Sequence, residues 1–183
     1  MDLDPATQPT PEHEKSKEVL DDNARKFITE PLDPEFLEAQ GAIPFLLITD
    51  WLETGEDNET KVVYKKLNNG EVQIFLISKT TKDGKRTKEK EEITEEKYKE
   101  LLGSPARHVE KMRHEFTYTQ NGTTFAANYD EFAGGKLFML DVDASTEEEK
   151  DSFSPSEFPI KLAEVTADMQ YYGYRVADVI IQT

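Results

Sequence analysis

Two Asn-Gly pairs, each placed between two strand-like segments, limit the fold of this chain more than any other feature. The pairs are Asn69-Gly70 and Asn121-Gly122. Asn-Gly supplies the two positive-φ positions of a tight hairpin turn, so each pair predicts an antiparallel hairpin. The segments that flank the two turns are residues 61–66 with 72–79, and residues 108–119 with 123–132.

The first turn also predicts which side chains share a face of the sheet. With a two-residue turn at Asn69-Gly70, Tyr64 and Lys66 lie on the same face as Lys79. The opposite face then carries Val63 and the apolar residues 72, 74 and 76. This register makes Lys66 and Lys79 candidates for a common site.

Further segments extend the sheet and add short helices. Residues 33–41 read as a helix that ends near Gly41, and residues 94–102 as a helix with Thr94 as its N-cap. Residues 145–150 and the terminal segment from Ala167 onward are also predicted to be helical. The remaining strands are predicted at residues 23–28, 43–52, 86–93, 136–143 and 163–166. Strands joined mostly by hairpins, with helices between some of them, predict an α+β fold whose antiparallel sheet is closed or nearly closed into a barrel.

The first 20 residues differ from the rest in composition. They are rich in Pro and acidic residues and poor in large apolar ones, which predicts a disordered or loosely packed tail before a single domain at 21–183. No apolar run approaches the roughly 18 to 20 residues of a membrane span, and no signal peptide is evident. The chain has no cysteine. Together these features favour a cytoplasmic protein.

Charge is spread unevenly along the chain. The formal net charge is -16, but residues 61–120 carry an excess of Lys and Arg while both flanking parts are acidic. The overall negative field argues against extended nucleic acid as a partner. The positive middle of the chain is compatible with a small anion, although much of the acidity serves solubility.

Several strand segments carry like charges at every second residue, and therefore on one face. Arg86, Lys88 and Lys90 form such a stripe, which is either an anion-binding wall or a solvated sheet edge. Glu89 and Glu91 form the other stripe of the same strand, so a shift of one residue would invert the interpretation.

Asp141 and Asp143 form the corresponding acidic pair. They alternate with core-forming residues in the segment LFMLDVD. Two carboxylates on one stripe repel each other unless a cation lies between them or one stays protonated. Hard oxygen ligands of this kind suit Mg²⁺ or Mn²⁺. The alternative is a strand that runs out into an acidic loop. Glu164, next to Val165, adds a further carboxylate that is predicted to be partly buried.

Taken in order, these segments resemble the CYTH domain family, the triphosphate tunnel metalloenzymes. The resemblance runs from about Asp22 to Val179. It is carried by ARKF, FLISK, the segment from Arg86 to Ile93 followed by TEEKYKELL, KMR, DEFAG, LFMLDVD and EVTADMQYY. The pair of EVTAD and DVD is the most specific part.

The resemblance implies an eight-stranded antiparallel tunnel in which basic residues bind a triphosphate and acidic residues hold one or two divalent ions. By motif, the phosphate-binding residues would be Lys26, Lys66, Lys79, Arg86, Lys111 and Arg113. The metal-binding residues would be Asp22, Asp141, Asp143 and Glu164, with Mg²⁺ or Mn²⁺ as the ion. The implied activity is that of a metal-dependent triphosphatase, a phosphoric anhydride hydrolase, ahead of an adenylate cyclase.

The chain departs from the family pattern at acidic motif residues that the family uses to bind metal. The opening E-x-E-x-K motif reads Asp22-Asn23-Ala24-Arg25-Lys26, so its second carboxylate is an alanine. The family's acidic pair after the arginine aligns with Lys88 and Lys90. These changes predict weaker metal binding and stronger anion binding.

Three hypotheses follow for the function. The first is a protein that binds tripolyphosphate, or a nucleoside or thiamine triphosphate, and hydrolyses it with a divalent metal. The second is a catalytically inactive CYTH-like module that binds an anionic metabolite. The third is an interaction protein that uses its acidic surface.

Overall fold

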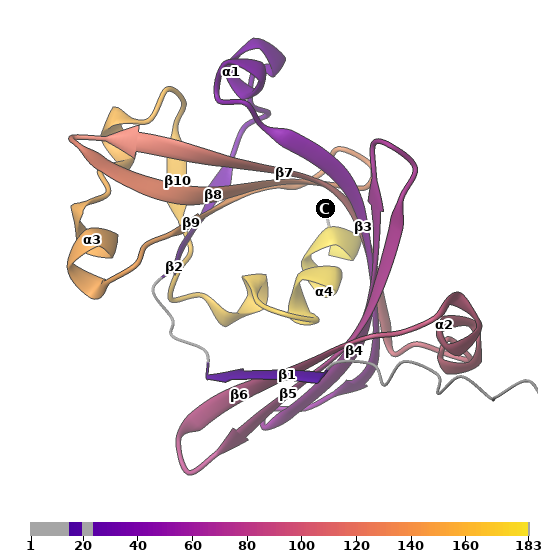
Figure 1. Ribbon diagram of the computed structural model, residues 1–183. Coiled ribbons are helices and arrows are strands. Elements are labelled where there is room, and N and C mark those ends of the chain that lie inside the picture. The colour runs from indigo at the N-terminus through magenta and orange to yellow at the C-terminus, as the bar shows by residue number, and fades with distance from the viewer. Residues whose placement is uncertain (1–14, 20–23, 183) are drawn as a thin grey trace, which may run out of the picture.

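The computed structural model describes residues 15–19 and 24–182 (Figure 1). Within them, a single antiparallel sheet of ten strands forms the body of the protein. The strands are β1 (Lys15–Val19), β2 (Ala24–Thr29), β3 (Ile43–Thr54), β4 (Asn58–Leu67), β5 (Val72–Lys82), β6 (Lys85–Glu92), β7 (Arg107–Gln120), β8 (Thr123–Phe132), β9 (Phe138–Asp143) and β10 (Leu162–Glu164).

The sheet curves around a central space but does not close. Its strand order is β1-β6-β5-β4-β3-β7-β8-β9-β2-β10, and no pairing among the described residues joins β1 to β10 (Figure 1). The α+β class and the antiparallel sheet are confirmed. The predicted closed tunnel of eight strands is corrected: the sheet is open and has ten strands, and the two at its edges, β1 and β10, are short.

The two Asn-Gly turns differ from each other. Asn121 and Gly122 both have positive φ, 51° and 83°, and Gln120 pairs with Thr123, as a two-residue turn requires. In the first hairpin only Gly70 has positive φ, and the Leu67 amide donates to the Glu71 carbonyl.

The first loop is therefore one residue longer than predicted, and this changes the register. Glu59 pairs with Lys79, while Lys66 pairs with Val72. Lys79 shares its face with Lys61 and Lys65, and Lys66 lies on the opposite face. The predicted placement of Tyr64 and Lys66 beside Lys79 is wrong for this reason.

Helices cover both faces of the curved sheet. Asp33 caps the first helix by accepting from the Glu35 amide, and Thr94 caps the second by accepting from the Lys97 amide. The predicted terminal helix from Ala167 is shorter than expected, because Gly173 interrupts the segment with a φ of 54°. The helices are α1 (Pro34–Ala39), α2 (Glu95–Leu101), α3 (Glu147–Ser152) and α4 (Arg175–Gln182), with single 3₁₀ turns η1 (Pro155–Glu157) and η2 (Met169–Tyr171).

Three apolar clusters hold the structure together. On the convex face, α1 and the segment from α3 to β10 pack around Phe27, Tyr129 and Leu140, while α2 packs against Val62 and its neighbours. On the concave face, α4 lies inside the curve of the sheet (Figure 1). Its cluster consists of Trp51, Val109, Phe132, Leu137, Met139, Val176 and Ala177. The helix therefore fills part of the interior, and the rest of the concave face carries charged side chains together with the buried apolar residues Phe45, Leu47 and Ile77.

The predicted tail boundary at residue 20 is too late, since residues 15–19 pair with β6 as strand β1. Residues 1–14 and 20–23 lie outside the described residues, so the rest of the tail stays a prediction. Among the helices that the structure describes, none is both long and apolar enough to cross a membrane.

Candidate functional site

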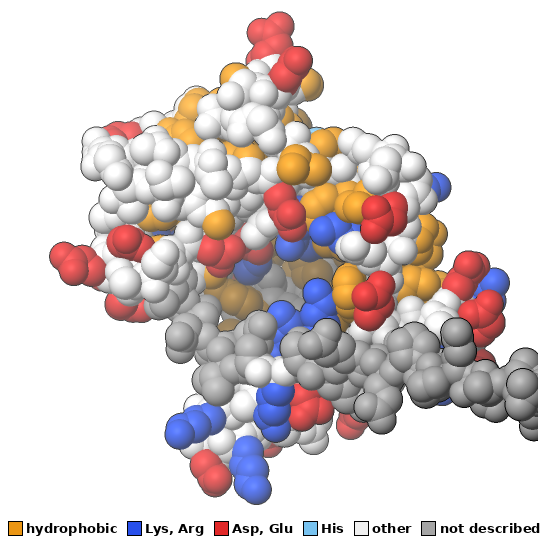
Figure 2. Space-filling model, in the orientation of Figure 1, with side chains coloured by type: hydrophobic (Ala, Val, Ile, Leu, Met, Phe, Trp, Pro, Cys, Tyr) orange, Lys and Arg blue, Asp and Glu red, His pale blue; other side chains and the backbone are white. Residues whose placement is uncertain are grey.

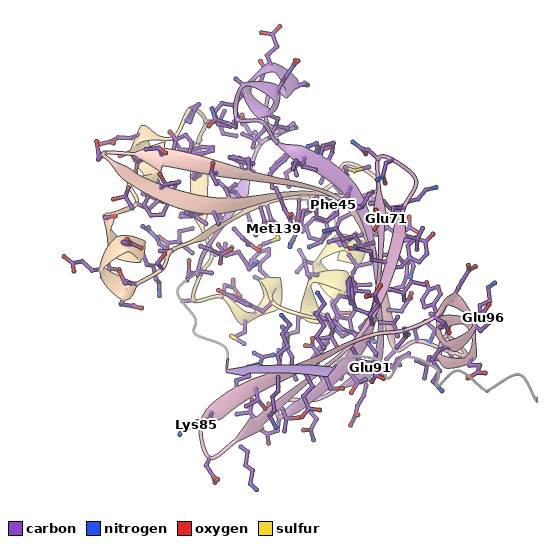
Figure 3. All side chains as sticks on the ribbon, viewed as in Figure 1. Phe45, Glu71, Lys85, Glu91, Glu96 and Met139 are labelled. Carbon is purple, nitrogen blue, oxygen red and sulfur yellow. The ribbon has the colours of Figure 1, made fainter. Side chains whose placement is uncertain are left out.

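The register of the sheet decides which charged residues face the concave side. Residues paired directly across neighbouring strands point to the same face. One row runs from Arg113 through Asp130 to Met139, and the next from Asn128 through Asp141 to Lys26. Phe45 and Met139 mark this side of the sheet in Figure 3.

Asp130 is the most enclosed carboxylate of the concave face, with 3% of its surface exposed. It accepts hydrogen bonds from Lys111 Nζ at 2.6 Å and from Arg113 Nε and Nη2 at 2.7 Å each. Burial alone would raise the pKa of Asp130, but Lys111 and Arg113 hold it at about 2. Burial in turn lowers the pKa of Lys111 to about 8, although Asp130 opposes this shift. These three residues form a compact ion cluster.

The acidic pair of β9 lies beside this cluster. Lys26 Nζ donates to Asp141, and Asn128 Nδ2 donates to Asp143 at 3.3 Å. Burial and then the neighbouring Asp141 charge raise the pKa of Asp143. Ala24 is the residue paired with Asp143 on β2, so the alanine of the altered opening motif does face the acidic pair.

The opposite wall, on β4, β5 and β6, is rich in cations; its residues are Lys61, Lys79, Arg86, Lys88 and Lys90, and we call it the cationic wall. Lys79 pairs with Lys88, and Thr81 pairs with Arg86. Burial lowers the pKa of Lys79 to about 8, and the charges of Lys61, Arg86 and Lys88 act in the same direction. Burial also lowers the pKa of Lys61. On its other side, Lys88 pairs with Glu18 of β1.

Glu59 is the buried carboxylate of the cationic wall, with 5% of its surface exposed. Its Oε1 lies 3.3 Å from Lys61 Nζ. Burial would raise the pKa of Glu59, but Lys61 and Lys79 lower it. Its other oxygen lies against Gly173, where an added Cβ would come within 2.7 Å of Oε2. The chain just before α4 therefore approaches the wall without room for a side chain.

The space-filling view agrees with this arrangement. Figure 2 shows a hollow near the centre of the molecule with Lys and Arg side chains along its edge. Further Lys and Arg side chains lie on the outer surface at the lower end of the molecule in this view.

The structure brings together most of the site residues that the sequence predicts. Those on the concave face are Lys26, Lys79, Arg86, Lys111, Arg113, Asp141 and Asp143. Lys66 is exposed on the convex face, as its register requires. Asp22 lies outside the described residues, so its predicted role stays a prediction.

Glu164 is also on the convex face, because it pairs with Phe27 of the convex core. Its two oxygens accept from Arg25 Nε at 2.9 Å and Arg25 Nη2 at 2.7 Å. This hydrogen bonding lowers the pKa of Glu164. Glu164 thus fastens β10 to β2, and the expectation that it joins the acidic pair is corrected.

Sequence reasoning missed three members of the site. Asp130 begins the DEFAG motif but was given no role in the site, and Glu59 and Lys61 lie in none of the motifs. A signal for Asp130 did exist, since Lys111 and Arg113 at alternate positions of a buried strand need a nearby carboxylate. No comparable signal pointed to Glu59, because its burial depends on the approach of Gly173.

The described residues offer limited support for a metal centre. Among them, His, Asp and Glu side chains nowhere form a group of three placed to hold a metal ion. Asp141 and Asp143 still present two carboxylates on one stripe. One or two carboxylates together with phosphate oxygens are a common way to bind Mg²⁺, and Asp141 and Asp143 have the chemistry to supply the carboxylates.

Comparisons with known proteins agree on the fold. No protein-family model and no curated protein matches the chain. Among solved structures, the chain is similar to the inorganic triphosphatase NE1496, with 21% identity, a TM-score of 0.59, and coverage of 84% of this chain and 95% of that chain. It is also similar to the PH1819 protein from Pyrococcus horikoshii OT3, with 16% identity, a TM-score of 0.56, and coverage of 87% and 99%. The chain therefore has the CYTH-like fold that its sequence motifs imply.

Proposed function

We propose that the concave face binds a triphosphate, with inorganic tripolyphosphate as the simplest example, and hydrolyses it with the help of Mg²⁺ or Mn²⁺. The observation that carries this proposal is the grouping of Lys61, Lys79 and Lys88 on one face of neighbouring strands, where burial lowers the pKa of Lys79 to about 8. A buried cation in such surroundings is stabilised by an anionic ligand. The triphosphatase named above, which shares the fold, supports the same ligand class.

The two sides of the concave face would have different roles. The cationic wall would bind the phosphate groups, and the side that carries Asp141 and Asp143 would hold the metal ion. Lys79, Arg86 and Lys88 would bind phosphoryl oxygens by charge-assisted hydrogen bonds. Lys111 and Arg113 are already fixed by Asp130, so they present cations to the ligand without further ordering.

The reaction would transfer the terminal phosphoryl group to water. A new P–O bond forms with the water oxygen, the bridging P–O bond breaks, and diphosphate leaves. Cations along the cationic wall would stabilise the charge that develops on the phosphate oxygens. Asp141 and Asp143 would hold the divalent ion, whose charge neutralises those oxygens when it is bound.

Phosphate release is the direct test. The protein would be incubated with tripolyphosphate, ATP or thiamine triphosphate in the presence of Mg²⁺ or Mn²⁺. We expect release from at least one of them and at least a tenfold loss of rate in Lys79→Ala. Lys66→Ala is the matched control on the convex face and should keep the wild-type rate. The absence of release from every substrate would exclude the enzyme.

A second candidate function is binding without turnover, and Ala24 favours it. The alanine faces Asp143 at a position where the family motif has a carboxylate. Titration calorimetry with tripolyphosphate, with and without Mg²⁺, separates the two functions. Tight binding together with no phosphate release supports the binding module, whereas the absence of binding rejects both candidates.

A further inference from the structure

We infer that Glu59 is a positioning residue of the concave face. It acts as an internal counter-anion that keeps Lys61 and Lys79 charged, and a bound triphosphate must compete with it for these two lysines. The competition rests on the proposed function, whereas the effect of Glu59 on the lysines does not. The place of Glu59 in the sheet, its burial and the contacts of its two carboxylate oxygens carry this inference.

The sheet register places Glu59 among the cations of the cationic wall. Glu59 pairs with Lys79 across β4 and β5, and Lys79 pairs in turn with Lys88 of β6. Directly paired residues share a face of the sheet, and Lys61 lies on the same face two residues further along β4. A phosphate group that contacts Lys61 and Lys79 therefore meets the Glu59 carboxylate beside them.

Burial makes this carboxylate and the two lysines depend on one another. Glu59 is 5% exposed, and burial would raise its pKa, but Lys61 and Lys79 lower it. Burial lowers the pKa of both lysines, and Glu59 opposes that shift in each. The three charges therefore stabilise one another, and removing Glu59 would leave two buried cations without the carboxylate that opposes the effect of burial.

The two oxygens of Glu59 have different surroundings. Oε1 forms an ion pair with Lys61 Nζ at 3.3 Å that lacks the alignment of a hydrogen bond, and no other described residue donates a hydrogen bond to it. Oε2 faces the backbone of Gly173, where an added Cβ would lie 2.7 Å away. Charge and packing hold the carboxylate in place, so an anion can take its position beside Lys61 without breaking a hydrogen bond to Oε1.

Lys79 receives charge from both neighbouring strands, and Glu59 is the carboxylate among the groups that act on it. These groups are Glu59 and Lys61 of β4 and Arg86 and Lys88 of β6, while Glu18 of β1 pairs with Lys88 on the far side. The segment before α4 contributes the uncharged Gly173. Replacing Glu59 by a neutral residue has two opposite effects on a bound anion. Repulsion by the carboxylate disappears, but Lys79 loses its proton at a lower pH.

Glu59→Gln is therefore expected to change both the affinity for tripolyphosphate and its pH dependence. Calorimetry at pH values of about 6.5 and 9 should show roughly three- to tenfold tighter binding than the wild type at the lower pH, and the loss of this gain at the higher pH. The matched control is Glu56→Gln, which removes the same charge from an exposed position in the loop between β3 and β4. The control should follow the wild type at both pH values.

The titration of Lys79 in the ligand-free protein gives a second measurement, by NMR with isotope-labelled lysine. The pKa of Lys79 should fall further below its value of about 8 in Glu59→Gln and stay unchanged in Glu56→Gln. Glu59→Asp keeps the charge but withdraws it by one methylene, so its effect should be intermediate. This variant also serves as the test if Glu59→Gln does not fold.

A glycine pair tests the contact at Oε2 without changing any charge. Gly173→Ala would displace Oε2, whereas Gly135→Ala, at a similar positive φ of 63°, has nothing within 4 Å of the added Cβ. We expect the pKa of Lys79 to change in Gly173→Ala and to stay at the wild-type value in Gly135→Ala. Equal values in these two variants would show that Gly173 does not position Glu59.

The outcomes separate this inference from the proposed function. If Glu59→Gln leaves the pKa of Lys79 unchanged, or binds tripolyphosphate with the same pH profile as Glu56→Gln, the inference is overturned although the wild type still binds. A gain in affinity that keeps its full size at the higher pH overturns the counter-anion role as well. If tripolyphosphate binds none of the proteins, the proposed function is rejected and the competition with it, while the titration of Lys79 still decides the effect of Glu59 on the lysines.

Discussion

Lys79 illustrates how the concave face sets the protonation of its side chains. Burial and three neighbouring cations lower its pKa to about 8. Lys79 is charged at neutral pH, although burial and the neighbouring cations destabilise its charged form. A bound polyanion would offset this destabilisation. The free energy of ligand binding and the proton occupancy of Lys79 are therefore linked.

Tripolyphosphate affinity is expected to fall as the pH rises through about 8. Below that pH Lys79 carries its proton, and above it the free protein loses this charge, so binding must be accompanied by proton uptake. Lys79→Arg should remove this part of the dependence, because arginine stays charged throughout. Calorimetry between pH 7 and 9.5, in buffers of different ionisation enthalpy, measures both effects. A proton uptake that is identical in wild type and Lys79→Arg would contradict the assignment.

Asp130 gives a prediction about stability. Its folded pKa of about 2 lies below its ordinary value of 3.8. This depressed pKa contributes stability that is present above about pH 4 and is lost as the pH falls toward 2. The contribution is on the order of 2 kcal/mol. Urea unfolding of the wild type should show this loss over that range.

Asp130→Asn tests the same cluster by substitution. It leaves Lys111 and Arg113 buried without their counter-charge and should destabilise the protein by about 3–5 kcal/mol at pH 7. The exposed Asp151→Asn serves as the control and should change the free energy of unfolding by less than about 0.5 kcal/mol. An Asp130→Asn protein as stable as this control would show that the cluster contributes nothing.

At the scale of the element, each strand carries two different surfaces, and β4 shows the difference at adjacent positions. Lys65 faces inward, where its Nζ lies 4.0 Å from the Phe45 ring centre, while Lys66 faces solvent. A register error of one residue exchanges the two. Binding measurements on single-residue variants therefore report register as well as function.

Lys88→Ala is expected to lower tripolyphosphate affinity by roughly tenfold, since it removes a cation from the concave face of β6. Lys66→Ala removes the same charge from the convex face of β4 and should leave the affinity within about twofold. Calorimetry at low ionic strength compares the two. Similar losses in both variants would mean that only overall charge matters and that the strand faces do not.

Helix α4 packs its apolar side against the interior of the sheet, and Val176 is 7% exposed there. Val176→Ala should lower the free energy of unfolding by about 1–2 kcal/mol. Ile43→Ala is the control, because Ile43 is 62% exposed and its loss should have little effect. Urea unfolding distinguishes the two, and equal losses would place α4 outside the folded core.

Sequence patterns predicted most of the helices and strands well. They predicted less well which side chains lie on which face of the sheet. The turn at Asn121-Gly122 uses both positive-φ positions, whereas at Asn69-Gly70 only the glycine does, and this difference cannot be read from the two letters. The alternation of Asp141 and Asp143 located the acidic pair correctly on the concave face. Glu164 was misplaced because its face depends on the pairing of β10 with β2, two strands that are distant in sequence, and this pairing puts it beside Arg25 on the convex face.

At the scale of the whole molecule, positive charge gathers on one wall of the concave face, opposite the carboxylates of β8 and β9. The net charge of -16 coexists with a wall where lysine charges are buried side by side. This separation favours small or short polyanions that fit inside the local positive region. A triphosphate bound as proposed would relieve part of the repulsion among these lysines.

Ligand binding should therefore stabilise the folded protein measurably. Tripolyphosphate at a hundredfold excess over its Kd is expected to add about 2.7 kcal/mol to the free energy of unfolding. Thermal unfolding with and without tripolyphosphate measures this gain. Sulfate at equal ionic strength is the control for general salt effects, and Lys79→Ala with Lys88→Ala should lose most of the gain. A rise in Tm that sulfate reproduces fully would show that no specific site is involved.

The contact between Gly173 and Glu59 connects the end of the chain to the electrostatics of the site. The carboxylate that offsets Lys61 and Lys79 is pressed against a backbone position with no space for a side chain. The segment that contains Gly173 thus helps to hold Glu59 beside Lys61 and Lys79. When it is seated, Glu59 is held among the lysines, and any movement of the segment would change how strongly the interior attracts an anion. The packing of the segment before α4 and the charge balance of the concave face are therefore coupled through Glu59.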